Sequence, residues 1–374
     1  MHPLREPGRR VLRRGRVLTP GPRAVIDTAA FSHNLQRVRE HAPGCRVLAV
    51  VKANAYGHGI VTAARSLAAD AFAVARLDEA LALREAGIDA RIVLLEGVQD
   101  AGELEVAAAQ GLEPFVCDDR QLALLERWRG ARTFRVWLKI DSGMGRLGFR
   151  PAEVRRAAAR LAGCAGVAQP PLLATHLAES EARGNAHTRA QLACFAEATT
   201  GLPGERSIAN SAGLIAWPEA RADWVRPGIM LYGISPFPDS TGAALGLRPV
   251  MRFETRVIAV KDLAAGDRVG YGGAWAATGP ARIAIAAAGY GDGYPRAAVN
   301  GTPVLVKGRP GALAGRVSMD MIAIDVSGRD DVAAGDPVQL WGPELPIERV
   351  AAAAGTIAYE LACRVSRRVP HQLA

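Results

Sequence analysis

Two alternating residue patterns over the first 235 residues constrain the fold most. From about residue 24, short runs of β-forming residues alternate with amphipathic, alanine-rich segments of helical periodicity. Such repeats predict a parallel sheet, and eight of them predict a (β/α)8 TIM-type barrel, which takes about 250 residues. We expect the strands at Val47–Lys52, Ala71–Ala75, Ile92–Leu95, Pro114–Cys117, Arg135–Ile140, Leu172–His176, Arg206–Ala209 and Trp224–Arg226. Intervening helices are expected at, for example, Asp78–Ala86 and His187–Ala198.

Beyond about Gly242 the pattern changes to short alternating strands separated by Gly and Pro turns. It predicts a mostly antiparallel β domain, joined to the barrel through the Pro-, Gly- and Ser-rich segment Ser235–Gly246. Strands are expected at Phe253–Val260, Ile283–Ala287, Pro303–Val306 and Met321–Val326, and a helix at Ile347–Ala353. The α/β chain thus divides into a leader (1–23), a barrel (24–241) and a C-terminal β domain (242–374).

The formal charge of +9 is concentrated at the start of the chain. Residues 1–23 hold seven arginines and one acidic residue, so they account for +6 of it. The remaining residues show no basic stripe interleaved with aromatics, which argues against nucleic acid as a partner. We expect a flexible leader, and an organelle transit peptide stays open as an alternative.

Cysteine spacing and hydropathy indicate the compartment. The five cysteines show neither metal-ligand spacing nor a disulfide framework, so we expect no metal site and a reducing cytoplasm. No apolar run approaches the roughly 20 residues that span a bilayer, and the N-terminus lacks the apolar core of a secretion signal. We therefore expect a cytoplasmic protein without a membrane partner.

Lys52 lies at the end of an apolar strand that a barrel covers on both faces. Burial disfavours an ammonium ion, so such a lysine becomes available as a base or as a nucleophile toward an aldehyde. The alternative is a lysine whose stem lies along the strand while its amine reaches water.

The segment Val50–Gly59, VVKANAYGHG, resembles the lysine motif of the alanine racemase family, which depends on pyridoxal 5'-phosphate (PLP). The resemblance continues from about residue 24 to 370. Further matching segments are Asp141–Gly148, Thr175–His176, Asn210–Ser211, Trp224–Ile229, Gly270–Gly272, Gly289–Tyr294 and Val317–Asp320. The resemblance implies a PLP-binding barrel followed by a β domain, in agreement with the residue patterns described above.

The resemblance implies two catalytic residues. Lys52 binds PLP covalently and then acts as the base on one face of the substrate α carbon. Inversion needs a second acid or base on the opposite face, and Tyr271 matches the family's tyrosine for that task. In the family this tyrosine and the residue matching Met319, whose amide contacts the substrate carboxylate, come from the partner subunit. A homodimer with interfacial active sites follows, although Tyr271 by itself also suits a packed turn.

By the same resemblance, Arg226 faces the pyridine nitrogen of PLP and His176 is bonded to Arg226. A guanidinium keeps its proton, so it leaves the ring nitrogen largely unprotonated and the ring a poorer electron sink. That disfavours transamination and decarboxylation. Both cations would also stabilise a Tyr271 phenolate, although a lone His or Arg in a strand is more often structural.

The remaining site residues are implied by position in the family. For the cofactor phosphate they are Asn210, Ser211, Gly228, Ile229, Tyr56 and Tyr359. Arg146 matches an arginine that contacts the cofactor and the substrate carboxylate, and Lys139 matches a lysine that many members carry as a carbamate. Weaker matches, to the entry corridor, are Tyr290, Arg296 and Asp320.

The sequence therefore predicts racemisation of alanine, serving either peptidoglycan synthesis or alanine catabolism. Arg226 argues against a decarboxylase of the same architecture. An amino-acid racemase of broader specificity stays open. A non-catalytic PLP-binding protein usually stops at a single barrel, so the β domain with Tyr271 and Met319 argues against it.

Overall fold

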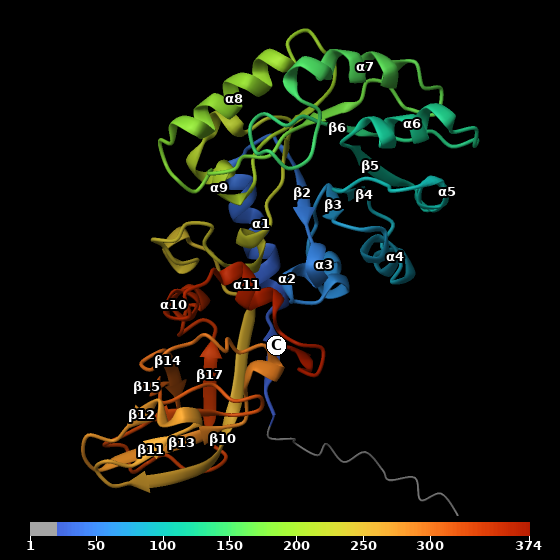
Figure 1. Ribbon diagram of the computed structural model, residues 1–374. Helices are drawn as coiled ribbons and strands as arrows, with labels where there is room; N and C mark the ends of the chain where they lie inside the picture. Colours follow the sequence, from blue (N-terminus) through green and yellow to red (C-terminus); the bar gives the residue numbers. More distant parts are fainter. Residues whose placement is uncertain (1–20) are drawn as a thin grey trace, which may run out of the picture.

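Eight parallel strands close into a barrel in the first part of the chain. A computed structural model describes residues 21–374, with the barrel above the β domain in the view of Figure 1. The barrel strands are β2 (Arg46–Val50), β3 (Ala71–Val74), β4 (Ile92–Leu94), β5 (Leu112–Val116), β6 (Trp137–Lys139), β7 (Leu172–Ala174), β8 (Arg206–Ser207) and β9 (Trp224–Val225). Pairing of β9 with β2 completes the closure, and all eight predicted strands are confirmed.

Helices between the strands cover the barrel. They are α1 (Thr28–His41), α2 (Lys52–Tyr56), α3 (Ile60–Ser66), α4 (Leu77–Glu85), α5 (Ala101–Ala109), α6 (Asp119–Arg127), α7 (Val154–Ala162), α8 (Ala186–Ala198) and α9 (Ser211–Ala216). Several begin at an Asp or Asn whose side chain accepts backbone N–H groups, as Asp27, Asp100, Asp118 and Asn185 do. The two helices predicted as examples correspond to α4 and α8.

Aromatic side chains fill the amino-terminal end of the barrel. Trp224 is fully buried, and its ring meets that of Trp137 edge to face at 5.6 Å. The guanidinium groups of Arg46 and Arg91 lie over the Trp224 ring, 4.5 and 4.7 Å from its centre. Since this end is packed, space for a ligand remains at the carboxyl-terminal end of the strands.

The second domain is an antiparallel sheet closed on itself. Around the ring its strands follow the order β10 (Met251–Leu263), β13 (Ala281–Ala286), β16 (Ile322–Asp325), β15 (Arg309–Leu313), β14 (Pro303–Val306) and β17 (Pro337–Trp341). The predicted strands correspond to β10, β13, β14 and β16, and α10 (Ile347–Ala353) matches the predicted helix. A small hairpin, β11 (Arg268–Val269) and β12 (Trp275–Ala276), and the helix α11 (Ala358–Cys363) were not predicted.

The first and last strands of the described residues pair with each other in the second domain. β1 (Arg23–Ile26) runs antiparallel to β10 and parallel to β18 (His371–Leu373). This corrects the expected domain boundary, because residues 24–26 belong to the sheet of the β domain, and Arg23, assigned to the leader, is part of the same strand. The partners of β1 lie more than 200 residues away, so no local pattern indicates the pairing. The rest of the leader, residues 1–20, lies outside the described residues.

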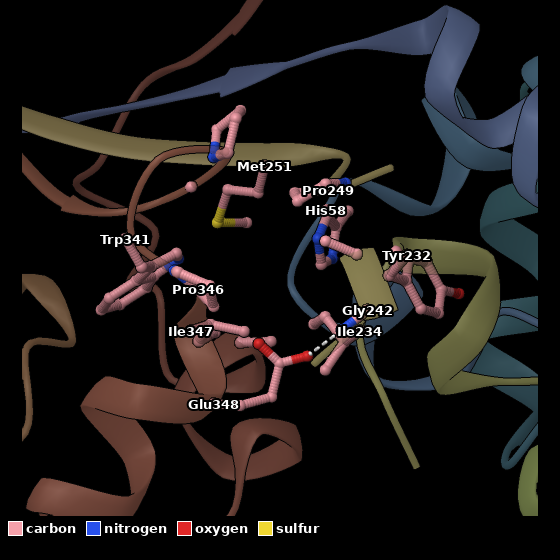
Figure 2. A pocket seen from close by; sticks show the side chains of 15 residues that line it. His58, Tyr232, Ile234, Gly242, Pro249, Met251, Trp341, Pro346, Ile347 and Glu348 are labelled. Atoms are coloured by element: carbon pink, nitrogen blue, oxygen red, sulfur yellow. Dashed lines mark hydrogen bonds between the residues drawn. The ribbon is translucent and has the colours of Figure 1, made fainter. Parts of the chain in front are cut away.

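The segment that connects the domains is fixed by Glu348 of α10. Its carboxylate accepts the backbone N–H groups of Ser235 and Gly242 at 2.8 and 2.9 Å. Figure 2 shows the contact with Gly242 beside His58 and Trp341, which come from opposite domains and line a cavity of about 20 Å³. That volume suits a single water molecule, so the junction is a packed contact. Within residues 21–374, no helix combines the length and the apolar character needed to cross a membrane.

Candidate active site

A cavity of about 500 Å³ opens at the carboxyl-terminal ends of the barrel strands. Every residue predicted from the sequence to hold the cofactor lines it: Lys52, Tyr56, Arg146, His176, Asn210, Ser211, Arg226, Gly228, Ile229 and Tyr359. These residues come from five different barrel units and from α11, so only the closed barrel brings them together.

Lys52 reaches this cavity from just beyond β2. The sequence placed it within the strand, but β2 ends at Val50 and Lys52 begins α2, where it is half-buried. The four residues after it have left-handed backbone, with φ of 53°, 53°, 54° and 52°. The turn that follows puts Tyr56 into the same cavity as Lys52.

Hydroxyl groups gather on one side of the cavity. Ser211 accepts the N–H groups of Gly228 at 2.9 Å and Met230 at 3.4 Å, so its own proton is free to donate. Within residues 21–374, the phenol groups of Tyr56 and Tyr359 make no hydrogen bond. Burial raises the pKa of both phenols, so they remain protonated donors. Three hydroxyl donors beside a backbone turn form a cradle for an anion.

Gly228 and Asn210 shape this cradle. The Tyr56 hydroxyl approaches Gly228 so closely that an added Cβ would lie 2.5 Å from it. The backbone N–H of Gly228 donates to Ser211 Oγ. Asn210 is the N-cap of α9, accepting Gly213 N–H at 2.8 Å, and this contact sets the position of Ser211.

Arg226 is buried in the wall of the cavity. It donates to Ser207 Oγ at 2.6 Å and to the carbonyls of Thr175 and Ile208. Burial lowers its pKa to about 10, so the guanidinium stays charged at neutral pH. Its contact with His176 Nδ1 is long, at 3.5 Å. Burial, and after it the charge of Arg226, lowers the pKa of His176 well below its ordinary value. The neutral imidazole therefore accepts at Nδ1 and keeps its proton on Nε2.

The loop after β6 carries Arg146. Asp141 holds this loop by accepting three backbone N–H groups, those of Gly143, Met144 and Gly145, at 2.9 to 3.0 Å. Arg146 itself is exposed at the cavity mouth. Lys139 lies deeper, and burial together with the charge of Arg226 lowers its pKa to about 7. A buried amine that is half neutral at pH 7 is able to react with carbon dioxide.

The structure does not bring Tyr271 or Met319 to the cavity of the same chain. Tyr271 lies in a short 3-10 turn, Tyr271–Gly273, and is 67% exposed. Met319 is 53% exposed. Neighbouring Asp320 is bonded to Arg368 at 2.8 Å. Tyr271 and Met319 thus lie on the surface of the β domain.

Several lining residues were missed from the sequence: Leu95, Glu96, Phe115, Met144, Leu147 and Cys363. Cys363 follows Tyr359 by one helical turn, so a prediction of α11 would have found it. Met144 and Leu147 flank Arg146 within a motif that the sequence did single out. The others stand at the ends of predicted strands, where buried packing gives the same pattern.

A lysine at the open end of a barrel, in the same cavity as an anion cradle and a buried arginine, is the arrangement expected of barrel enzymes that hold a phosphate-bearing aldehyde cofactor. Family models then give the particular family. The model of the alanine racemase N-terminal domain matches residues 26–236, and that of the C-terminal domain matches residues 250–373. The chain belongs to the alanine racemase family.

Individual relatives agree along the whole length. Alanine racemase from Nitrosococcus oceani is 52% identical over 354 residues, which cover 94% of this chain and 99% of the relative. The crystal structure of biosynthetic alanine racemase from Pseudomonas aeruginosa superposes with a TM-score of 0.91 at 44% identity, covering 95% of this chain and 99% of that one. Alanine racemase from Bartonella henselae, solved with covalently bound pyridoxal phosphate, gives 0.85 at 30% identity, with 95% and 99% covered.

Proposed function

We propose that this chain interconverts L-alanine and D-alanine with PLP as cofactor, using Lys52 and Tyr271 on opposite faces of the substrate α carbon. The observation that carries the proposal is that Lys52, the buried guanidinium of Arg226 and the hydroxyl cradle line a single cavity. Its relatives in the family are alanine racemases, which supports the same reaction here.

The residues of this cavity fit PLP. The Lys52 amine suits the aldehyde group, and the hydroxyls of Tyr56, Ser211 and Tyr359 suit the phosphate. When bound, PLP supplies an electron-withdrawing ring that acidifies the α hydrogen of an amino acid joined to it. The relative from Bartonella henselae with covalently bound pyridoxal phosphate supports this assignment.

Arg226 determines how strongly the ring withdraws electrons. Arg226 is charged and fixed by Ser207 and by two carbonyls, so it would donate to the ring nitrogen of bound PLP and would give up no proton. Electron withdrawal is therefore moderate, which favours return of the proton to the α carbon over loss of the carboxylate. This argument supports a racemase over a decarboxylase.

The second face of the substrate requires a second copy of the chain. Tyr271 and Met319 are exposed on the β domain and do not line the cavity of their own chain. Exposed Tyr290 and Met321 extend this surface. We propose a homodimer in which each β domain covers the partner's cavity and donates Tyr271 and the Met319 amide. There the Nε2–H of His176 is available to stabilise the Tyr271 phenolate.

Two further parts of the proposal concern the size of the substrate and the physiological setting of the reaction. In this proposal Arg146, which lines the cavity, binds the substrate carboxylate, and closure by a partner's residues would leave space for a small side chain. The relative from Pseudomonas aeruginosa is named biosynthetic, which supports supply of D-alanine for peptidoglycan over alanine catabolism. All five cysteines are free thiols, which supports a reducing cytoplasm.

Mixing two inactive variants tests the proposal. Lys52→Ala and Tyr271→Phe should each abolish racemisation, because each removes one of the two groups. In a dimer of one chain of each kind, one cavity regains both groups, so random mixing should restore about a quarter of wild-type activity. No recovery, in a sample whose mixed dimers are verified by differently tagged subunits, would overturn the assignment of Tyr271 to the partner's site.

Proton exchange tests the two-face mechanism separately. With Tyr271→Phe in D2O, one enantiomer of alanine should exchange its α hydrogen without inversion, since Lys52 still serves its own face. Loss of exchange with both enantiomers, in protein that still binds PLP, would contradict the role of Lys52 as a base.

A further inference from the structure

The turn that follows Lys52 has an unusual backbone. Ala53, Asn54, Ala55 and Tyr56 all have φ near +53°, with ψ from 46° to 51° over the first three. Residues with a side chain rarely adopt this left-handed conformation, and runs of it are rarer still. Such a conformation persists only where the surrounding structure imposes it.

Glu79 of α4 contacts the backbone of the residue that directly follows Lys52. Its Oε1 accepts the N–H of Ala53 at 2.5 Å, and its Oε2 accepts the N–H of Ala75 at 2.8 Å. Ala53 N belongs to the peptide that joins it to Lys52, and Ala75 directly follows β3. One carboxylate therefore connects the start of the left-handed turn to the end of the adjacent barrel strand.

Other contacts hold the residues on either side of the turn. Tyr232 donates its hydroxyl to the carbonyl of Val50 at 2.8 Å, which fixes the end of β2. His371 contacts the carbonyl of Gly57 at 2.9 Å. Neither contact involves the peptide after Lys52, so Glu79 alone among these groups acts on it.

We propose that Glu79 is a positioning residue for Lys52: by holding Ala53 N–H it keeps the turn left-handed and the lysine amine aimed into the cavity. This inference rests on the proposed function for the role of Lys52. Glu79 acts through the backbone and is not among the residues that line the cavity.

Glu79 also supports the start of α4, because its Oε2 accepts the N–H of Arg76 at 3.4 Å in addition to that of Ala75. Loss of this helix start would lower stability without any specific effect on Lys52. Glycine at position 53 separates the two roles. Glycine adopts the left-handed region without steric cost, so Ala53→Gly relieves the turn and leaves the start of α4 unchanged.

The experiment compares Glu79→Gln, Glu85→Gln and the double variant Glu79→Gln with Ala53→Gly, against wild type and Ala53→Gly alone. Glu85 is an exposed residue of the same helix, so its change matches the loss of charge. The measurements are the dissociation constant for PLP, kcat and KM for alanine, and the Tm of the cofactor-free protein.

We expect Glu79→Gln to lower kcat and PLP affinity by about tenfold while KM for alanine stays within about twofold, since misplaced reacting groups slow the reaction. In the Glu79→Gln background, Ala53→Gly should raise both kcat and PLP affinity by at least about threefold, because it removes the strain that Glu79 opposes. Glu85→Gln should match wild type.

Two results would overturn the inference. One is a Glu79→Gln protein with wild-type kcat and PLP affinity. The other is a loss that follows the fall in Tm and that Ala53→Gly does not recover. PLP affinity is measured without alanine, so this comparison does not depend on racemase activity. If the wild-type chain failed to racemise alanine, the proposed function alone would be refuted. The PLP affinities of the variants would still decide the role of Glu79.

Discussion

Gly228→Ala tests whether the close contact at the anion cradle controls cofactor binding. The added Cβ would lie 2.5 Å from the Tyr56 hydroxyl and 3.1 Å from its ring carbon, where ordinary contacts start near 3.4 Å. The phenol would therefore have to retreat by about 0.9 Å, the difference between the first and last of these distances. Tyr56 is buried and stacked on Tyr232 at 4.8 Å, so it has little space for this shift.

Overpacking of this kind costs about 1–3 kcal/mol, which corresponds to roughly 5-fold to 150-fold in a dissociation constant. We expect PLP affinity to fall by that factor in Gly228→Ala, as measured by absorbance during titration of the cofactor-free protein. Gly163→Ala is the matched control, because Gly163 has φ of −79° and the nearest atom to an added Cβ lies 3.4 Å away. A folded Gly228→Ala protein that binds PLP within about twofold of wild type would refute this reasoning.

Two further predictions concern protonation. Burial lowers the pKa of His58 to about 4, below its unfolded value of about 6.5, so the unfolded state binds more protons between these values. The free energy of unfolding should therefore fall by up to about 3 kcal/mol as pH drops from 6.5 to 4, and urea titrations of His58→Asn should lose this slope. For Lys139, with a pKa of about 7, the neutral amine should rise from about a tenth at pH 6 to about nine tenths at pH 8. A carbamate signal in 13C NMR with labelled bicarbonate should increase over the same range and be absent from Lys139→Arg; a flat signal would contradict the assignment.

The barrel strands could be predicted because each is a short β-rich run buried on both faces, which leaves a local pattern. The pairing of β1 with β10 and β18 could not be, since it depends on residues more than 200 positions away. The left-handed turn after Lys52 was also missed. Its residues include alanine and asparagine without a glycine signal, and contacts such as Glu79 to Ala53 become visible only in three dimensions.

The cavity residues were found through motifs rather than through periodicity. Ser211 and Gly228 lie next to each other because β8 and β9 are adjacent in the barrel, which the strand order already implied. The N-cap role of Asn210 and the bond between Gly228 N–H and Ser211 required coordinates, because they depend on side-chain direction. Exposure of Tyr271 agrees with the proposed partner-dependent site.

The parallel pairing of β1 with β18 has a consequence for biosynthesis. All eight barrel strands are inserted between β1 and β10, so β1, the first strand of the described residues, pairs with strands that are synthesised much later. The barrel can close while the ribosome is still translating, whereas the sheet that contains β1 is completed only when residues 371–373 have emerged. A nascent chain therefore closes its barrel well before α11 and β18 complete the cofactor cavity and the sheet of the β domain.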